Sequence, residues 1–278
     1  GDLRARGFLL GATAGRTTLN GEGLQHEDGH SQVMAGLIPN CVSYDPTFAY
    51  ELAVIIHDGL RRMVGEQEDV YYYITVMNEN YLHPGLGDAA DKNATAGILK
   101  GLYLLKEGAK KKHRVQLMGS GTILREVIAA ADLLASDWDV GADLWSAPSF
   151  NELRRDGLDC ERWNLLHPTE KPRESHVEKC LKDRAGPVIA STDYVKSFAD
   201  QIRAFMPKGR SYRVLGTDGF GRSDTRERLR HHFEVNRYWV TVAALKALAE
   251  EGALKPQVVA DAIKKYGLDV NKPNPLSV

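Results

Sequence analysis

Short runs of β-branched and aromatic residues alternate with longer helical stripes along most of this chain, and no other feature constrains the fold as strongly. Apolar runs of this kind are typical of strands buried in a sheet. We expect strands over residues 70–77, 115–118, 142–146, 187–191 and 212–216. Because such strands alternate with helices, the pattern predicts an α/β protein with mainly parallel sheets covered by helices.

The helices are indicated by apolar periodicity and by residues that start or end a helix. Asp45 at the N-cap and Pro46 in the first turn predict a helix that Gly65 ends. Asp224 and Glu227 fit a capping box at the start of a later helix. Further helices are expected over residues 123–131, 194–205, 224–233, 239–250 and 256–266.

A stretch rich in Gly, Ala, Asp and Asn, residues 83–97, interrupts this pattern and is the candidate linker. A chain of 278 residues is long enough for one large or two medium domains. We therefore expect one domain over residues 1–85 and a second over residues 86–278.

The charge balance argues against polyanionic partners. With 36 basic and 37 acidic residues, the chain offers no electrostatic reason to bind nucleic acid or an anionic membrane. No apolar run approaches the length of a membrane span. Cys41, Cys160 and Cys180 are widely spaced and form no CxxC pair, so we expect free thiols in a reducing compartment, the cytoplasm.

Residues 20–30, NGEGLQHEDGH, hold two histidines, three acids and three glycines, with Leu24 as the only large apolar side chain. Such a stretch contributes little to a core, and polar loops on a rigid scaffold are where catalytic groups tend to lie. A solvated glycine-rich turn also explains the composition. His26 and His30 have the spacing of metal ligands, but the glycines disfavour the helix that would place both imidazoles on one face.

Two other glycine-rich segments resemble ligand-binding loops, but tight turns explain their glycines more simply. Met118-Gly119-Ser120-Gly121 lies between a predicted strand and helix, where a dinucleotide phosphate binds in some folds, but Leu124 replaces the third glycine. A tight turn explains both glycines. Residues 216–224, GTDGFGRSD, lack the spacing of a calcium loop and fit a glycine-permitted turn.

Several long blocks, in order along the chain, resemble one enzyme family. They are GRTTLNGEGLQHEDGHS (15–31), IPNCVSYDP (38–46), YYYITVMNENY (71–81), DGLDCERWN (156–164), ASTDYVKSFADQIR (190–203) and YRVLGTDGFGRSDTRERLRHHFEV (212–235). Together they resemble the homodimeric, bacterial type of pyruvate dehydrogenase E1, the thiamine-diphosphate-dependent, acetyl-transferring component of its complex. The resemblance implies the end of a transketolase-like middle (pyrimidine-side) domain over 1–85 and a transketolase-like C-terminal domain over 86–278.

The resemblance covers the last third or so of the family's length, so we expect a segment of a longer enzyme. The chain opens at Gly1 without an initiator Met, and no full strand or helix is expected before residue 18. The family's GDG…Asn motif for Mg²⁺ and the cofactor diphosphate is missing, because Thr217-Asp218-Gly219 is followed too closely by Asn236. The glutamate that faces the aminopyrimidine ring should also precede Gly1. Thiamine diphosphate and Mg²⁺ are thus expected in the parent, with the metal and diphosphate ligands outside this chain, which should be inactive alone.

Glu22 and His26 are the candidate catalytic and cofactor-binding residues. A histidine can hydrogen-bond the carboxylate of a 2-oxo acid and then hold or donate a proton, and a carboxyl with a raised pKa can donate a hydrogen bond. In the resembled family, the matching positions lie beside the reactive thiazolium end of the cofactor. Gln25, Asp28 and His30 are expected to shape the loop or the subunit interface, and no residue is expected to bind a metal.

The resemblance also implies partners: pyruvate, the dihydrolipoyl acetyltransferase component and a second copy in a homodimer, with no nucleic acid and no membrane. Three alternatives stay open. They are a non-catalytic assembly module, another transketolase-like thiamine enzyme, and a metal-dependent hydrolase that uses His26, Glu27 and His30. The DGLDCERWN block favours the pyruvate enzyme over a transketolase.

Overall fold

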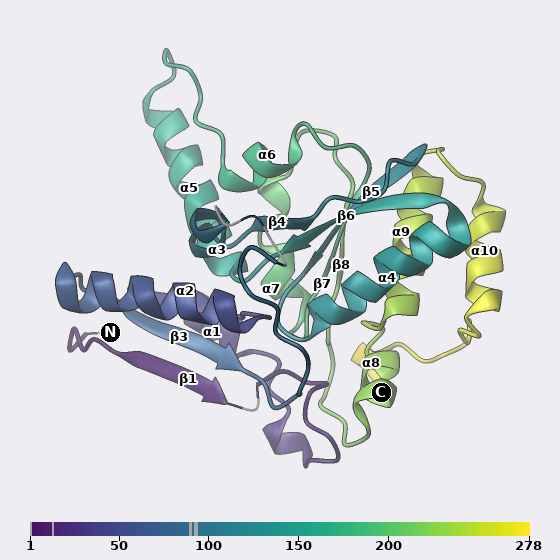
Figure 1. Ribbon diagram of the computed structural model, residues 1–278, viewed down its shortest axis with the longest axis horizontal. Helices are drawn as coiled ribbons and strands as arrows, with labels where there is room; N and C mark the ends of the chain where they lie inside the picture. Colours follow the sequence, from purple (N-terminus) through teal and green to yellow (C-terminus); the bar gives the residue numbers. More distant parts are fainter. Residues whose placement is uncertain (1, 13, 89–90, 92–93) are drawn as a thin grey trace.

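The computed structural model describes residues 2–12, 14–88, 91 and 94–278, which fold around two separate β-sheets (Figure 1). The first sheet has three parallel strands in the order β1-β3-β2: β1 (Phe8–Ala12), β3 (Tyr71–Val76) and β2 (Cys41–Tyr44). Its helices are α1 (Ser31–Gly36) and α2 (Ala49–Leu60), which continues as a π-helical turn over Arg61–Gly65. A Cβ on Gly59 of α2 would stand 2.6 Å from the Phe8 ring, so the helix approaches the sheet as closely as glycine permits.

The second sheet has five strands in the order β4-β6-β5-β7-β8, and β4 at one edge runs antiparallel to its neighbour. The strands are β4 (Tyr103–Lys106), β5 (His113–Gly119), β6 (Val140–Ser146), β7 (Val188–Ser191) and β8 (Tyr212–Leu215). The helices of this part are α3 (Thr95–Lys100), α4 (Ile123–Trp138), α5 (Phe150–Leu166), α6 (His176–Leu181), α7 (Lys196–Asp200), α8 (Arg226–His232), α9 (Arg237–Glu250) and α10 (Pro256–Lys265). Short 3₁₀ turns occupy Leu24–His26, Arg203–Phe205 and Pro275–Ser277.

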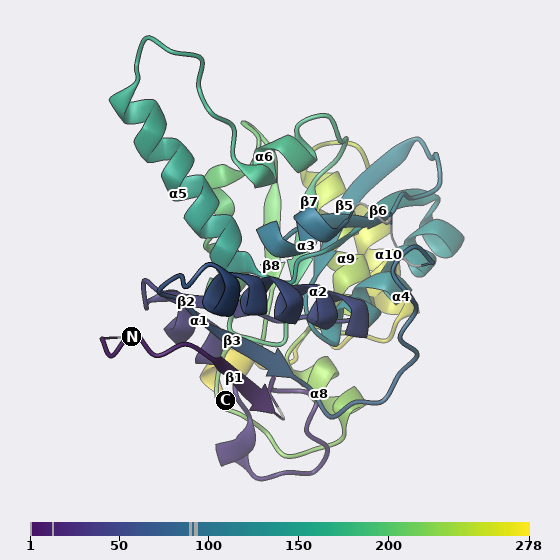
Figure 2. The ribbon, with the colours of Figure 1, turned by 60° about the vertical axis from the view of Figure 1, so that its left-hand side comes forward.

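Helices cover both faces of the second sheet. Figures 1 and 2 show α4, α9 and α10 on one face and α5, α6 and α7 on the other. Phe198 packs edge to face on Phe150 and Tyr194 between the sheet and α5, with ring centroids 5.2 Å and 5.5 Å apart. Tyr72 and Ile74 of the first sheet belong to the same buried cluster as the residues under α4 and α9, so the two sheets share one core.

The predicted α/β class with mainly parallel sheets is confirmed. All five predicted strands are present, as β3, β5, β6, β7 and β8, and each end lies within two residues of its prediction. The glycine turn after residue 118 joins β5 to α4, as expected for a tight strand-to-helix turn. A Cβ on Gly119 would stand 2.7 Å from the Leu124 Cα, so the strand and the helix pack too closely there for any larger residue.

The prediction that Asp45 caps the first helix is wrong. Helix α2 begins at Ala49, and the Asp45 carboxylate instead accepts hydrogen bonds from Thr75 Oγ1 and Ser120 Oγ, each at 2.7 Å. The Glu51 carboxylate, in the first turn of α2, caps the helix instead. It accepts from the N–H groups of Thr47 and Phe48, the two residues that precede Ala49. Buried polar groups are nearly always hydrogen-bonded, and the hydroxyls of Thr75 and Ser120 meet that requirement for Asp45.

Three further expectations are corrected. The capping box at Asp224 is wrong, since Thr225 is the N-cap of α8 and its Oγ1 accepts from the Arg228 N–H. The helix predicted over 194–205 is divided into α7 and a 3₁₀ turn. Strand β1 lies in the segment where no strand is expected, and β2, β4 and the long helix α5 are not predicted by the sequence pattern either.

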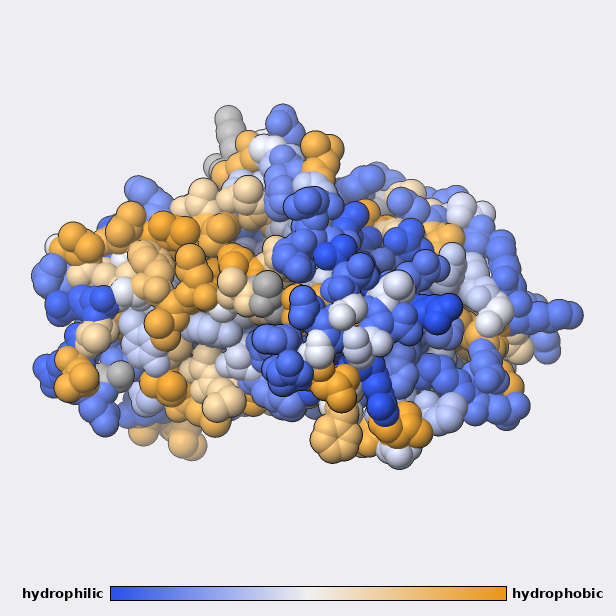
Figure 3. All heavy atoms as spheres, turned by 90° about the horizontal axis from the view of Figure 1, so that it is seen from below, coloured by the Kyte–Doolittle hydropathy of each residue, from blue (hydrophilic) through white to orange (hydrophobic). Residues whose placement is uncertain are grey.

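The candidate linker, residues 83–97, lies in part outside the described residues. Its described portion has no regular helix or strand until α3 begins at Thr95. The division at residues 85 and 86 stays a prediction. Strand β1 forms one edge of the first sheet and exposes Leu9 and Leu10, and Figure 3 shows large apolar areas on the part of the molecule that carries this sheet.

Candidate active site

Polar side chains gather where the carboxyl ends of strands from both sheets meet. Asp45 follows β2, Ser120 follows β5, and Asp193 stands two residues after β7. Ser120 donates to Asp45 and also lies 3.2 Å from Thr192 Oγ1, so these side chains connect the two sheets. The Asp193 carboxylate accepts from the Thr17 N–H, with N···O distances of 3.1 Å and 3.2 Å. Asp193 thus anchors the chain at Thr17, just before the loop of residues 20–30 begins.

Burial controls the protonation of the two aspartates in this seam. Neither Asp45 nor Asp193 is exposed, and burial raises the pKa of each to about 7, although hydroxyl or N–H donors lower it in part. Gly15 adopts a φ of +87°, and a Cβ on it would collide with the Asp193 carboxylate. The chain can therefore pass this carboxylate only with a glycine.

Replacing Asp45 with asparagine should flatten the pH dependence of stability. The folded chain keeps a proton on Asp45 up to a pKa of about 7, whereas the unfolded chain releases it near 3.8. The folded state therefore binds more protons between these values, and the free energy of unfolding falls as pH rises through this window. Asparagine cannot ionise, so Asp45→Asn should lose less stability from about pH 4 to about pH 7, by a few kcal/mol at most. Denaturant unfolding across this range measures both slopes, and equal slopes would contradict a neutral buried Asp45.

The two predicted catalytic residues lie on the surface of the loop that joins β1 to α1. His26 ends the 3₁₀ turn Leu24–His26, and Glu22 precedes that turn. Both residues are exposed, as is Gln25. Among the described residues, neither the Glu22 carboxylate nor the His26 imidazole has a hydrogen-bond partner. These side chains are therefore free to turn toward a ligand.

Asp28 and His30 have structural contacts within the loop. The Asp28 carboxylate accepts from the N–H groups of His30 and Ser31, at 3.1 Å and 3.0 Å, and from the Ser31 hydroxyl. These bonds fix the turn into α1. The His30 ring lies 3.2 Å from the guanidinium of Arg16, which is 2% exposed. Both residues thus have the loop-shaping contacts expected of them, although their part in a subunit interface stays a prediction.

Glu27 is the loop residue whose environment the sequence does not predict. Its side chain is buried, accepts from the Arg222 N–H at 3.2 Å, and has a pKa raised to about 7, chiefly by burial. It lines a cavity of about 520 Å³ together with Arg16, Leu24 and His30 of its own region, and with Val195, residues 218–221 and Leu276. Within the described chain, Glu22 and His26 stand outside this cavity. Composition alone could not separate the buried Glu27 from the exposed Glu22 and the half-buried Asp28.

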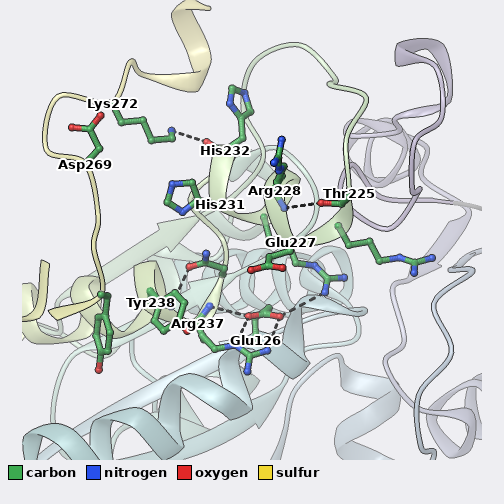
Figure 4. Close-up of a pocket in the computed structure, with 14 residues that line it drawn as sticks. Glu126, Thr225, Glu227, Arg228, His231, His232, Arg237, Tyr238, Asp269 and Lys272 are labelled. Carbon is green, nitrogen blue, oxygen red and sulfur yellow. Dashed lines mark hydrogen bonds and ion pairs between the residues drawn. The ribbon is translucent and has the colours of Figure 1, made fainter. Parts of the chain in front are cut away.

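A second, larger cavity, of about 1090 Å³, lies between α8, the start of α9 and the chain after α10 (Figure 4). Its walls carry many cations, but most of them are already paired. Arg237 Nε donates to Glu126 at 2.9 Å, Arg230 lies 3.6 Å from the same carboxylate, and Lys272 lies 3.1 Å from Glu234. This cavity therefore presents ion pairs rather than a free cationic surface.

Among the described residues, the nearest match to the Mg²⁺–diphosphate motif does not fit such a site. Asp218 Oδ1 accepts from the Lys196 N–H at 2.8 Å, and Asn236 Oδ1 caps α9 by accepting from Tyr238 and Trp239. Both side chains of the nearest motif match are thus used within the fold. In the parts of the chain that the structure covers, no group of three or more His, Cys, Asp and Glu side chains is arranged to hold a metal.

Two further observations concern the cysteines and the helices of the described chain. Cys41, Cys160 and Cys180 are all free. No helix in the described ranges has both the length and the apolar character needed to cross a membrane.

Comparison with known proteins adds a family relationship to this geometry. A family model described as the pyruvate dehydrogenase E1 component middle domain matches residues 1–84, and one described as the transketolase-like TK C-terminal domain matches residues 101–236. The chain is 69% identical, over 100% of its length, to the pyruvate dehydrogenase E1 component of Cupriavidus necator. It is 65% identical, over 99% of its length, to the protein of that name from Pseudomonas aeruginosa.

The chain spans about 30% of the length of the Cupriavidus relative and 31% of the Pseudomonas relative. Its fold is similar to that of a transketolase mutant from Pichia stipitis, with a TM-score of 0.60 over 88% of this chain and 30% of that one. At 16% identity this likeness shows the fold alone.

Proposed function

This chain belongs to the pyruvate dehydrogenase E1 family, of which it is a partial sequence, and we propose that its full-length parent decarboxylates pyruvate on thiamine diphosphate and transfers the acetyl group to the lipoyl group of the dihydrolipoyl acetyltransferase component. The observation that carries this proposal is the 69% identity, over the whole chain, to a protein named as an E1 component. The match of residues 1–84 to the E1 middle domain agrees with it.

We assign the chemistry of this chain to Glu22 and His26. The cofactor, when bound in the parent, supplies the electron sink for decarboxylation. His26 hydrogen-bonds the pyruvate carboxylate before CO₂ leaves and then holds or donates a proton beside the substrate. Glu22 lies four residues away on the same loop and, in its protonated form, donates a hydrogen bond to the substrate. The exposure of both side chains and their lack of partners in the described structure support these roles.

The other parts of the proposal concern groups outside this chain. Mg²⁺ and the cofactor diphosphate are held by residues of the parent that are absent here, because Asp218 and Asn236 are already bonded within the fold. We extend the proposal to a cytoplasmic homodimer within a multienzyme complex, on the family relationship. The chain alone, which offers no fitting set of metal or diphosphate ligands among its described residues, is inactive.

The alternatives have weaker support. The transketolase likeness is at 16% identity and extends to the fold only, whereas E1 components match at 69% and 65% identity. A non-catalytic assembly module does not require a loop with two exposed, unpartnered acid–base side chains. A metal-dependent hydrolase would need His26, Glu27 and His30 together, but Glu27 is buried while the two histidines are exposed.

The proposed function is tested on the full-length parent with two substrates. Pyruvate should release CO₂ in the presence of thiamine diphosphate and Mg²⁺, and the acetyl group should appear on a lipoylated acetyltransferase domain. A ketose phosphate should not be turned over under the same conditions. Preference for the ketose phosphate would replace this proposal with the transketolase-like alternative, and turnover of neither substrate would favour the assembly module.

A further inference from the structure

Residues 216–226, in the C-terminal part of the chain, lie along residues 20–30, the candidate catalytic loop. They form hydrogen bonds with the start of this loop. The Gly21 N–H donates to the Asp224 carbonyl at 3.0 Å, and the Arg226 N–H donates to Asn20 Oδ1 at 3.3 Å. Arg226 Nε also donates to the Thr18 carbonyl at 2.7 Å. The loop therefore leaves the first sheet already attached to a segment about 200 residues further along the chain.

The same segment also bonds to the end of the loop. The Arg222 N–H donates to the Glu27 carboxylate at 3.2 Å, and the Arg16 guanidinium, which contacts His30, donates to the Gly219 carbonyl. The Val195 N–H adds a bond to the Gly29 carbonyl at 3.0 Å. Glu27 and Arg16 are 6% and 2% exposed, so these attachments are shielded from water and from salt.

Glu22 and His26 lie between these two sets of attachments. Residues 20–21 are held at one end and residues 27–30 at the other, while the side chains of Glu22 and His26 have no hydrogen-bond partner among the described residues. The arrangement restricts the backbone of the loop and leaves the two candidate side chains free. Preorganisation of this kind gives a positioned group its catalytic value, since a displacement of about 1 Å can cost about 10²-fold in rate.

We propose that residues 216–226 are a positioning element for the candidate catalytic loop, and that Glu27 is its positioning residue on the loop. This inference rests on the proposed function, because it assumes that Glu22 and His26 act on the substrate. It gives the C-terminal part of the chain an indirect role in the reaction, through the backbone of the loop. Glu27 acts only through the backbone it holds.

The contact between Gly221 and Glu27 allows a test from outside the loop. A Cβ on Gly221 would stand 2.7 Å from the Glu27 Cβ and 3.2 Å from the Leu24 carbonyl, so Gly221→Ala must displace the loop. Gly65→Ala is the matched control, because a Cβ there meets nothing within 4 Å. In the full-length parent, Gly221→Ala should lower kcat for pyruvate by about 10-fold to 10²-fold, while the control keeps normal kcat. Cofactor Kd should stay equal in the two variants, and kcat is taken per folded site, because the clash lowers the melting temperature of Gly221→Ala.

Variants of Glu27 separate positioning from acid–base catalysis. Glu27→Ala removes the acceptor for the Arg222 N–H, so kcat should fall and amides 22–26 should exchange hydrogen faster. Glu27→Gln keeps an amide oxygen for that bond and should restore most of kcat, whereas a catalytic acid would be lost equally in both variants. Normal kcat in both Gly221→Ala and Glu27→Ala, or no rescue by Glu27→Gln, would overturn the positioning role.

A His26→Ala variant measured in parallel keeps the two proposals apart. Slow turnover in His26→Ala with normal turnover in Gly221→Ala and Glu27→Ala removes the positioning role alone. Normal turnover in His26→Ala removes the loop from the mechanism, and the inference then fails with the proposed function.

Discussion

Replacing His26 with alanine in the full-length parent should slow pyruvate turnover by roughly 10²–10⁴-fold, the range expected for loss of a positioned acid–base group. Glu22→Gln should have an effect of the same order. The melting temperature should change little, because both side chains are exposed and make no hydrogen bond within the described structure. Steady-state kinetics and thermal unfolding of the same preparations measure both quantities.

His30→Ala is the comparison variant from the same loop. Its ring contacts Arg16 and lines the 520 Å³ cavity, so its loss should affect the loop's geometry more than the chemistry and should slow turnover less than His26→Ala. A purely structural loop predicts the reverse pattern, in which the melting temperature falls and the rate per folded site is unchanged. Near-normal kcat in both the His26 and Glu22 variants would exclude this loop from catalysis.

The isolated chain should neither bind thiamine diphosphate tightly nor release CO₂ from pyruvate. Mg²⁺ requires near-octahedral oxygen ligands, and the diphosphate requires that metal. The closest candidates, Asp218 and Asn236, are engaged by Lys196, Tyr238 and Trp239. Calorimetric titration of the chain with cofactor and Mg²⁺ should therefore show no binding in the micromolar range.

The full-length parent under identical conditions is the positive control for that titration. It should bind the cofactor and turn over pyruvate, whereas the isolated chain should show a turnover indistinguishable from buffer. A micromolar or tighter Kd for the isolated chain would mean that the described residues contain a cofactor site that neither motif nor geometry reveals.

Strands β3, β5, β6, β7 and β8 could be predicted because each contains several β-branched, aromatic or other apolar residues close together. Strands β2 (CVSY) and β4 (YLLK) are not predicted, although β7 and β8 also have four residues each, so strand length alone does not explain the difference. Helix α5 has 17 residues, but its sequence is strongly polar and carries a glycine at position 157. That glycine packs against the Phe205 ring, a contact that only the folded chain reveals.

The helix starts show how tertiary contacts replace local rules. Asp45-Pro46 and Asp224 both precede helices and have suitable types for caps. Asp45 instead lies in the seam between the sheets, where Thr75 and Ser120 donate to it. Helix α8 is capped by Thr225, the residue after Asp224. A cap contributes about 1 kcal/mol, and two hydrogen bonds contribute about 0.5–1.5 kcal/mol each, so the contacts in the seam compete with the cap.

The sequence by itself determined the family, the alternation of strands and helices, and the loop that holds Glu22 and His26, because each depends on residues that are neighbours along the chain. Only the tertiary structure decided which acid of that loop is buried. Glu27 is covered because Arg222, 195 residues away, donates to it, while Glu22 and His26 meet no such segment and stay exposed. Burial depends on how distant segments pack together, and a local pattern of residues carries no record of that packing.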